Sequence, residues 1–357
     1  MTMRRDQSDP HHLSRREALG VLAGAAGAGL FELAGGSPLL AQGRGSALSF
    51  PPGAIIRGIA KDIDPRSIAP RATLIHEHPG TSTPNDLDLL VTELKQAYAD
   101  GLGCIVDSAT GRRSPEQVDH VRKGSVAAGV PIVLAGAYYL QPRYPKEIAT
   151  MSEDQIADQL VEDSVAQNWG ALGEFGSSET MHADERKMFR AAAKAHLRTG
   201  LPIFTHTPHS SCPKCALEQL DIFEKAGVDP RHVVIGHMSA IKDEDDPTSE
   251  THKAVARRGA FVGLDTMGHE MSQSSIPEVR KVNLVKRLLD AGFESQIVFS
   301  SDFANPKHLK SNWGMGFATV LTQFGPKLRY AGVKDDVIRH ITVDNPRRFL
   351  AFVPRKK

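Results

Sequence analysis

Histidines and carboxylates occur at the ends of five short apolar runs, where they could bind metal ions together. In chain order these residues are His76, His78, Glu174, His206, His237 and Asp302. Residues i and i+2 of a strand face the same side, so His76 and His78 could hold one cation between them. Four histidines and two carboxylates are enough to hold two zinc-like ions, with one carboxylate bridging them.

Each of these residues also has a structural interpretation. A lone histidine at a strand end is more often a hydrogen-bonded core residue, Glu174 alone could be a salt-bridged carboxylate, and Asp302 alone a helix cap. Burying so many ionisable groups at one end of an apolar interior is costly unless they are paired or coordinated. The joint pattern therefore favours a metal centre. If the histidines bind no metal, chelators will change neither the melting temperature nor any activity.

Two bound cations predict hydrolytic chemistry. A divalent cation lowers the pKa of its water to about 7, which provides a hydroxide nucleophile at neutral pH. A hydroxide bridging both ions would attack a carbonyl carbon or a phosphorus, and Asp302 is the expected acceptor of its proton. We therefore expect a hydrolase of an ester-like bond in a small molecule: a carboxylic ester, a lactone or an organophosphate ester.

Two alternatives to ester hydrolysis stay open. The same hydroxide could hydrolyse an amide or a cyclic amide. The chain could instead be a periplasmic binding protein that holds metal ions and catalyses no reaction, which is a different class of protein. Asp302 argues against the binding protein, because holding a metal requires no proton acceptor.

The apolar runs predict strands, and amphipathic segments between them predict helices. The expected strands cover 73–76, 103–107, 131–137, 171–175, 202–205, 233–236, 260–264 and 296–300, and the helical patterns include 86–100, 115–128, 184–199, 216–227, 249–258 and 277–292. Strands alternating with helices predict an α/β fold, a (β/α)8 TIM barrel of the metal-dependent hydrolase type, whose site lies at the C-terminal ends of the strands. An open doubly wound sheet is the alternative, although no glycine-rich dinucleotide loop follows the first expected strand.

The N-terminal residues predict an export signal. The paired arginines Arg15 and Arg16 precede a weakly apolar run over 21–33, with a cleavage point near Ala41. We expect a twin-arginine signal peptide over 1–41, an N-terminal segment over 42–70 and the barrel over 71–352, with a periplasmic or extracellular destination. A disordered basic N-terminus is the alternative.

Composition limits the classes of binding partner that we expect. Lys and Arg number 43 against 42 Asp and Glu, giving a net charge of +1, and no basic stretch is interleaved with aromatics, so no nucleic acid is expected. No membrane span is expected after signal removal, since Glu32 and many glycines interrupt the early apolar run. Cys212 and Cys215 could form a small disulfide or stay free thiols, and Cys104 is expected in the core.

From about residue 70 to 350 the sequence resembles the phosphotriesterase-related branch of the amidohydrolase superfamily. The matching stretches are 76–78, 106–107 with 111–112, 173–178, 199–207, 236–237, 301–302 and 345–346. The resemblance implies a barrel with two divalent ions, usually zinc, and allows a homodimer. It assigns the buried ion to His76, His78 and Asp302, the exposed ion to His206 and His237, and the bridge to Glu174.

The sequence departs from the family pattern at three places. Glu174 stands where the catalytic phosphotriesterases carry a carboxylated lysine, which places the chain nearer the phosphotriesterase homology proteins. Residues 265–268 lack the arginine that lactonases carry after strand 7. Residues 238–240 lack the aspartate that helps phosphotriesterases relay protons. These departures weaken the assignment as a lactonase or an efficient triesterase.

Loop residues near the expected site are candidate substrate contacts. They are Tyr138 and Tyr139 after the third strand, and Met267, His269 and Trp313 after the seventh and eighth. The alternative is packing at the rim for one of the tyrosines and packing on the surface for the other three residues.

Overall fold

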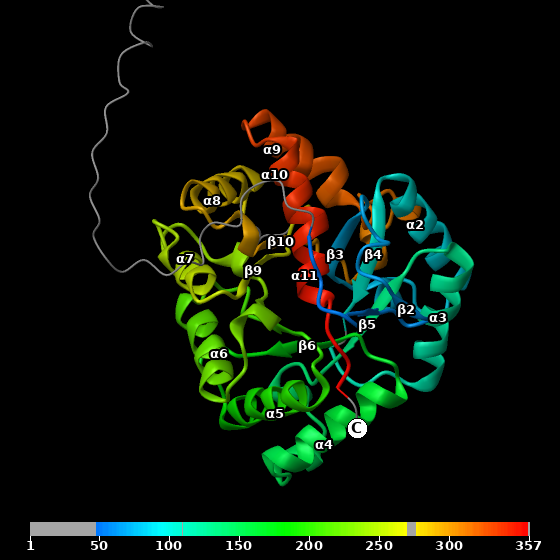
Figure 1. The fold of residues 1–357 in the computed structure, drawn as a ribbon, viewed down its shortest axis with the longest axis vertical. Helices are drawn as coiled ribbons and strands as arrows, with labels where there is room; N and C mark the ends of the chain where they lie inside the picture. The colour runs from blue at the N-terminus through cyan, green and yellow to red at the C-terminus, as the bar shows by residue number, and fades with distance from the viewer. Residues whose placement is uncertain (1–47, 109, 270–275, 356–357) are drawn as a thin grey trace, which may run out of the picture. The chain divides into compact units, whose positions relative to one another are not determined.

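Eight parallel strands form the centre of the chain in the computed structural model, which describes residues 48–108, 110–269 and 276–355 (Figure 1). They are β3 (Ala72–Glu77), β4 (Leu102–Asp107), β5 (Ile132–Gly136), β6 (Ala171–Gly176), β7 (Ile203–His206), β8 (Val233–Ile235), β9 (Phe261–Leu264) and β10 (Ile297–Phe299). Each strand pairs with the next in sequence order. The predicted signal peptide over 1–41 lies outside the described residues.

The loop after the last strand bonds to the first strand, so the barrel is nearly closed. The Asp302 N–H donates to the His76 carbonyl at 3.1 Å, and the His76 N–H donates to Ser300 Oγ at 2.8 Å. The strand order never reverses, whereas a doubly wound sheet requires a reversal. The (β/α)8 prediction is confirmed, and the open-sheet alternative is wrong.

Helices alternate with the strands and surround the barrel (Figure 1). They are α2 (Leu87–Ala99), α3 (Pro115–Ala128), α4 (Glu153–Ala166), α5 (Ala183–Thr199), α6 (Pro213–Lys225), α7 (Glu250–Arg257) and α8 (Glu278–Asp290), followed by α9 (Gly325–Tyr330), α10 (Asp335–Arg339) and α11 (Asn345–Leu350). Short elements precede them: β1 (Ile56–Arg57), β2 (Asp62–Ile63) and α1 (Pro79–Ser82). Among the described residues, we find no helix with the length and apolar character needed to cross a bilayer.

Local sequence explains where the helices begin and end. Ser114 caps α3 and Ser152 caps α4, each in a reciprocal capping box with the glutamine three residues later. Helix α3 ends at Gly129, whose φ of 69° suits glycine. The helical patterns predicted from the sequence agree with α2, α3, α5, α6, α7 and α8 to within a few residues.

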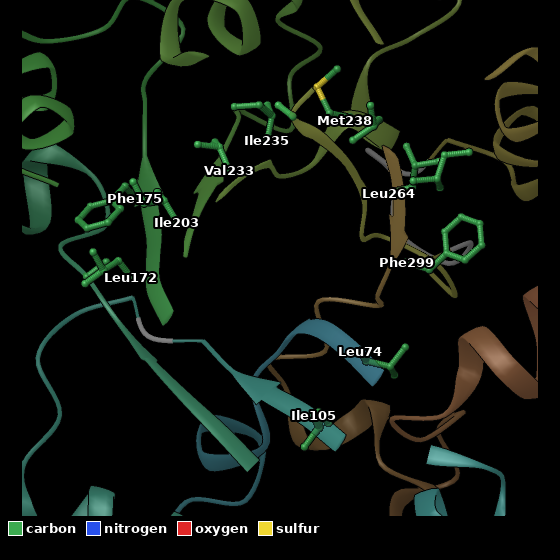
Figure 2. Close-up of a cluster of buried hydrophobic side chains, with 14 of the residues drawn as sticks. Leu74, Ile105, Leu172, Phe175, Ile203, Val233, Ile235, Met238, Leu264 and Phe299 are labelled. Atoms are coloured by element: carbon green, nitrogen blue, oxygen red, sulfur yellow. The ribbon is translucent and has the colours of Figure 1, made fainter. Parts of the chain in front are cut away.

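Side chains of each strand alternate between two apolar layers. The outer layer packs against the helices and includes Leu74, Ile105, Leu172, Ile203, Val233, Leu264 and Phe299 (Figure 2). The inner layer fills the barrel with Ile75, Cys104, Val106, Val133, Ala171, Phe204, Val234, Phe261 and Val298, together with Phe349 and Leu350 of α11. The Asn345 side chain donates to the carbonyl of Ile297, the first residue of β10, at 2.7 Å. Helix α11 therefore closes the N-terminal end of the barrel, and Cys104 is a core residue as predicted.

Strand β6 interrupts this alternation just where the interior becomes polar. Ala171 lies in the inner layer and Leu172 in the outer one, so strict alternation would place Phe175 inside. Phe175 instead packs in the outer layer, and the register of β6 against β7 shifts between Leu172 and Phe175. The shift turns Glu174 into the barrel. A matching shift in β3, between Leu74 and Glu77, accompanies the inward side chain of His76.

Candidate metal centre

The structure brings the predicted ligands together at the C-terminal end of the barrel, with Glu174 in the middle. Glu174 Oε2 lies 3.2 Å from His76 Nε2 and 3.3 Å from His206 Nδ1. The same oxygen lies 3.6 Å from His237 Nε2, and Glu174 Oε1 lies 3.8 Å from His78 Nε2. One carboxylate thus faces four histidines from the ends of three strands, β3, β7 and β8, which is the arrangement a bridging ligand needs.

Asp302 completes the group from the loop after β10. Its Oδ1 lies 2.8 Å from His78 Nε2 and 3.6 Å from His76 Nε2. Glu77, between the two histidines, fixes this loop: it accepts the Ser301 N–H at 2.6 Å and the Phe303 N–H at 3.1 Å. The residues on both sides of Asp302 are therefore tied to β3. Sequence reasoning did not single out Glu77, because its role depends on a loop more than two hundred residues away.

Backbone geometry also places His237. Gly236 precedes it, and a Cβ there would lie 2.0 Å from the Thr205 carbonyl oxygen, so only glycine allows β7 and β8 to approach this closely. His237 and Asp302 both have a φ of 54°, a left-handed conformation that is uncommon outside glycine. Such residues cluster at functional sites, where the surrounding structure holds them in place.

Unpartnered buried atoms provide a test of whether these residues fit a metal. Among the described residues, His76 Nε2, Glu174 Oε2 and His237 Nε2 have no hydrogen-bond partner although each is buried. Buried polar atoms normally have partners, because leaving them without one is costly. These atoms converge within the distances given above, so their lone pairs are available to cations. His76, His78 and Glu174 form one group whose ligand atoms lie within 4.8 Å of one another. The residues present fit the predicted metal centre.

A seventh side chain, Asp265 after β9, orients two of the histidines. Its Oδ2 lies 2.8 Å from His76 Nδ1 and its Oδ1 lies 2.9 Å from His237 Nδ1, and it is fully buried. A carboxylate that accepts the Nδ1–H of a histidine leaves Nε2 free to bind a metal. Sequence reasoning missed this role. The available signal was its position, directly after a strand like the other site residues.

Charge at the site favours cations. Burial raises the pKa of Glu174, but the neighbouring histidines, His76 first, outweigh burial and hold that pKa well below its ordinary value. Asp302 behaves in the same way, and its pKa is lowered. Burial lowers the pKa of His237, yet Asp265 and the other carboxylates raise it to about 10, so a bound cation would take the place of the proton on its Nε2. The carboxylates thus stay ionised in the interior and attract positive charge.

Tyr139 is the candidate substrate residue that reaches the centre. Its hydroxyl lies 3.0 Å from His206 Nε2, and its ring meets the imidazole edge-on. Burial raises the pKa of the Tyr139 phenol, and Glu174 and Asp302 raise it further. The hydroxyl therefore keeps its proton at neutral pH and can donate it in a hydrogen bond.

The other candidate substrate residues lie elsewhere. Tyr138 packs in the apolar core, edge-on to Tyr144, and Met267 is fully buried in the same core. Both side chains are buried more deeply than the packing at the rim or on the surface that we expected as the alternative. His269 bonds to the Ser301 carbonyl beside Asp302, so it lies next to the loop that carries a predicted ligand. Trp313 is 99% exposed, and its contact with a substrate stays a prediction.

The loop after β7 contributes one more histidine and a disulfide. His209 lies beside the centre, with its ring centroid 4.2 Å from that of His237. Sequence reasoning did not single it out, because it sits inside the loop and not at a strand end. Cys212 and Cys215 are joined by a disulfide at the start of α6, which resolves the two alternatives left open for them.

Comparison with known proteins agrees with this fold. The sequence profile of the phosphotriesterase family matches residues 72–350, and the chain belongs to this family. A phosphotriesterase homology protein of Escherichia coli is 29% identical over 297 residues, covering 78% of this chain and 97% of that protein. An N-acetyltaurine hydrolase of Dictyostelium discoideum is 28% identical over 284 residues, covering 75% and 74%. The crystal structure of a resiniferatoxin-binding protein from Rhodobacter sphaeroides superposes with a TM-score of 0.73 at 29% identity, covering 84% of this chain and 95% of that one.

Proposed function

We propose that this phosphotriesterase-family hydrolase uses two divalent ions, with zinc as the expected metal, to cleave an ester-like bond in a small molecule. The observation that carries the proposal is the convergence of unpartnered buried atoms of His76, Glu174 and His237 beside the ionised carboxylate of Asp302. A purely structural cluster would be expected to pair these atoms with hydrogen-bond donors or acceptors.

The proposed ligand sets are those that the family resemblance implies, and the distances between these side chains support them. The buried ion would be held by His76, His78 and Asp302, the more exposed ion by His206 and His237, and Glu174 would lie between them. When bound, such ions lower the pKa of water to about 7 and act as Lewis acids on a carbonyl or phosphoryl oxygen.

The protein's own groups supply the remaining steps. Asp302 is ionised because the histidines lower its pKa, and its side chain is 15% exposed, so its carboxylate can accept the proton of an attacking water. Tyr139 keeps its phenolic proton and can donate a hydrogen bond to a substrate oxygen. Asp265 keeps two histidines in the tautomer that binds a cation.

The leaving group favours an ester over an amide. An alkoxide or phenoxide leaves with less protonation than an amine, which needs a general acid. Tyr139 is a poor acid because its pKa is raised. For an amide, Asp302 would therefore have to pass the proton that it takes from water to the leaving amine. One observation favours the amide alternative: the relative from Dictyostelium is described as an N-acetyltaurine hydrolase, an enzyme that acts on an amide.

We also propose that the chain is exported by the twin-arginine route to the periplasm or cell surface. The Cys212–Cys215 disulfide supports this location, because disulfides persist in oxidising compartments. The signal itself lies outside the described residues, and a homodimer stays a prediction. Fractionation of cells expressing the full chain would test export, and replacement of Arg15 and Arg16 by lysine should retain the protein in the cytoplasm.

A substrate panel on the mature chain, zinc-loaded and metal-stripped, tests the reaction. It should contain an aryl ester, a set of lactones, an aryl phosphotriester, a cyclic amide and N-acetyltaurine. Turnover of an ester class that disappears on stripping and returns with zinc is the expected result. Metal-dependent turnover of an amide alone would replace the ester proposal with the amide alternative. Full turnover by metal-stripped protein would contradict the metal mechanism altogether.

A further inference from the structure

The loop from β7 to α6 carries an imidazole that the proposed ligand sets do not use. His209 lies three residues after His206, and its side chain is 45% exposed. Its ring centroid lies 4.2 Å from that of His237 and 5.3 Å from that of His206. Its Nε2 lies 3.9 Å from Asp302 Oδ2. The side chain therefore stands at the solvent side of the centre, over the more exposed pair of histidines.

The three imidazoles form a group able to hold one ion. The ligand atoms of His206, His209 and His237 lie within 4.8 Å of one another. Nitrogens around a tetrahedral zinc at about 2.1 Å lie roughly 3.4 Å apart, so only small side-chain rotations separate the group from zinc geometry. An independent observation points to a ligand here: His237 Nε2 is buried and has no hydrogen-bond partner among the described residues.

The loop holds His209 near this position. Pro208 precedes it and restricts the backbone. Two residues later, the Ser211 hydroxyl donates to Asp245 and accepts the Lys242 N–H at 2.9 Å, which ties the loop to the segment that follows β8. The disulfide then closes the start of α6. Because the loop is anchored on both sides, little conformational entropy should be lost when His209 binds an ion.

We propose that His209 is a third protein ligand of the more exposed ion, together with His206 and His237. This inference rests on the two-ion site of the proposed function and assigns a residue that the family resemblance did not assign. With His206, His237 and the bridging Glu174, His209 would give the more exposed ion four protein ligands. A substrate oxygen would then have to enter as a fifth ligand, as zinc sites allow during catalysis.

Metal titration of the mature chain tests this assignment without relying on activity. The variants are His209→Gln and His209→Ala, with His340→Gln as the matched control. His340 is also partly exposed and hydrogen-bonded, to Ser295 Oγ at 3.1 Å, but Ser295 precedes β10 and so lies at the opposite end of the barrel. Competition with a chromophoric chelator gives the affinity of each zinc equivalent. The visible spectrum of the Co²⁺-loaded protein reports on the ligands of each ion.

We expect both His209 variants to lower the affinity for the second zinc equivalent by at least about tenfold. Loss of a residue that only hydrogen-bonds to a metal ligand already costs that much. The first equivalent should be unchanged, the Co²⁺ spectrum should change only on the second addition, and the His340 variant should match wild type. Equal melting temperatures of the metal-stripped proteins would show that folding is intact. If one variant fails to fold, the other is used for the comparison.

Other results overturn the assignment, and they separate it from the proposed function. If wild type binds two ions and both His209 variants keep the second affinity within twofold with the same Co²⁺ spectrum, His209 is not a ligand and the two-ion hydrolase stands. A fall in turnover alone, with metal binding unchanged, would place His209 in contact with substrate instead. If wild type binds fewer than two ions, the two-ion function and this inference fail together.

Discussion

Replacing Asp265 with asparagine should weaken metal binding without altering any predicted ligand. Asp265 accepts the Nδ1–H of His76 at 2.8 Å and that of His237 at 2.9 Å, and it also accepts the His237 backbone N–H at 2.9 Å. Asparagine has one oxygen that accepts and one NH₂ that donates. The histidine facing the NH₂ must then carry its proton on Nε2, the atom that would bind the ion.

The magnitude follows from what is known of residues that hydrogen-bond to a metal-binding histidine without binding the ion themselves. Changing such a partner typically costs about 10–100-fold in metal affinity, which is about 1.4–2.8 kcal/mol. This range matches the loss of one charge-assisted hydrogen bond, about 1.5–3 kcal/mol. We expect the Asp265→Asn protein to fall within it, and Asp265→Ala to lose at least as much because neither Nδ1 would then be held.

Zinc affinity measured by chelator competition is the assay, and Asp246→Asn is the matched control. Asp246 is a buried carboxylate 2.9 Å from His252 Nδ1, so it has the same type of partner, but neither residue belongs to the predicted ligand set. The control should lower the melting temperature and leave zinc affinity near wild type. Zinc affinity within twofold of wild type in Asp265→Asn, in a folded protein, would refute the tautomer argument.

Three further changes have expected outcomes. Asp302→Asn should lower turnover by about 10²–10⁴-fold while zinc, measured by elemental analysis, stays bound; unchanged turnover would remove Asp302 from proton transfer. Burial lowers the pKa of His196 to about 4, below its ordinary value of about 6.5, so the unfolded chain takes up this proton first as the pH falls. The contribution of neutral His196 to the free energy of unfolding is fully present above about pH 6.5 and is lost toward pH 4, by up to about 3 kcal/mol. Urea unfolding at pH 7 and pH 5 should therefore show a smaller fall in the free energy of unfolding in His196→Gln than in wild type. Leu350→Ala, in the fully buried plug of α11, should cost about 2–5 kcal/mol in the free energy of unfolding with zinc affinity unchanged, and a cost under about 1 kcal/mol would contradict the closing role of α11.

The barrel and the positions of the predicted ligands could be read from the sequence because both depend on local patterns. Short apolar runs bounded by Gly, Pro and polar residues predicted all the barrel strands, since each strand is buried on both faces and needs only a few residues. In a parallel barrel the C-terminal ends of all strands meet at one face. A residue directly after a strand, such as His237 or Asp302, is therefore placed near the others by its position in the chain alone.

Other features were decided by contacts between distant segments. Strict alternation would point Glu174 away from the interior, and only the register shift against β7 turns it inward. The bond between Asp265 and His76 joins residues 189 positions apart and exists only after the strands close on themselves. His209 has no strand-end signal, and its place depends on how the loop is tied to the segment after β8. The sequence thus determined which residue types stand at the barrel mouth, while tertiary packing decided their orientation, because side-chain direction depends on register and loop closure.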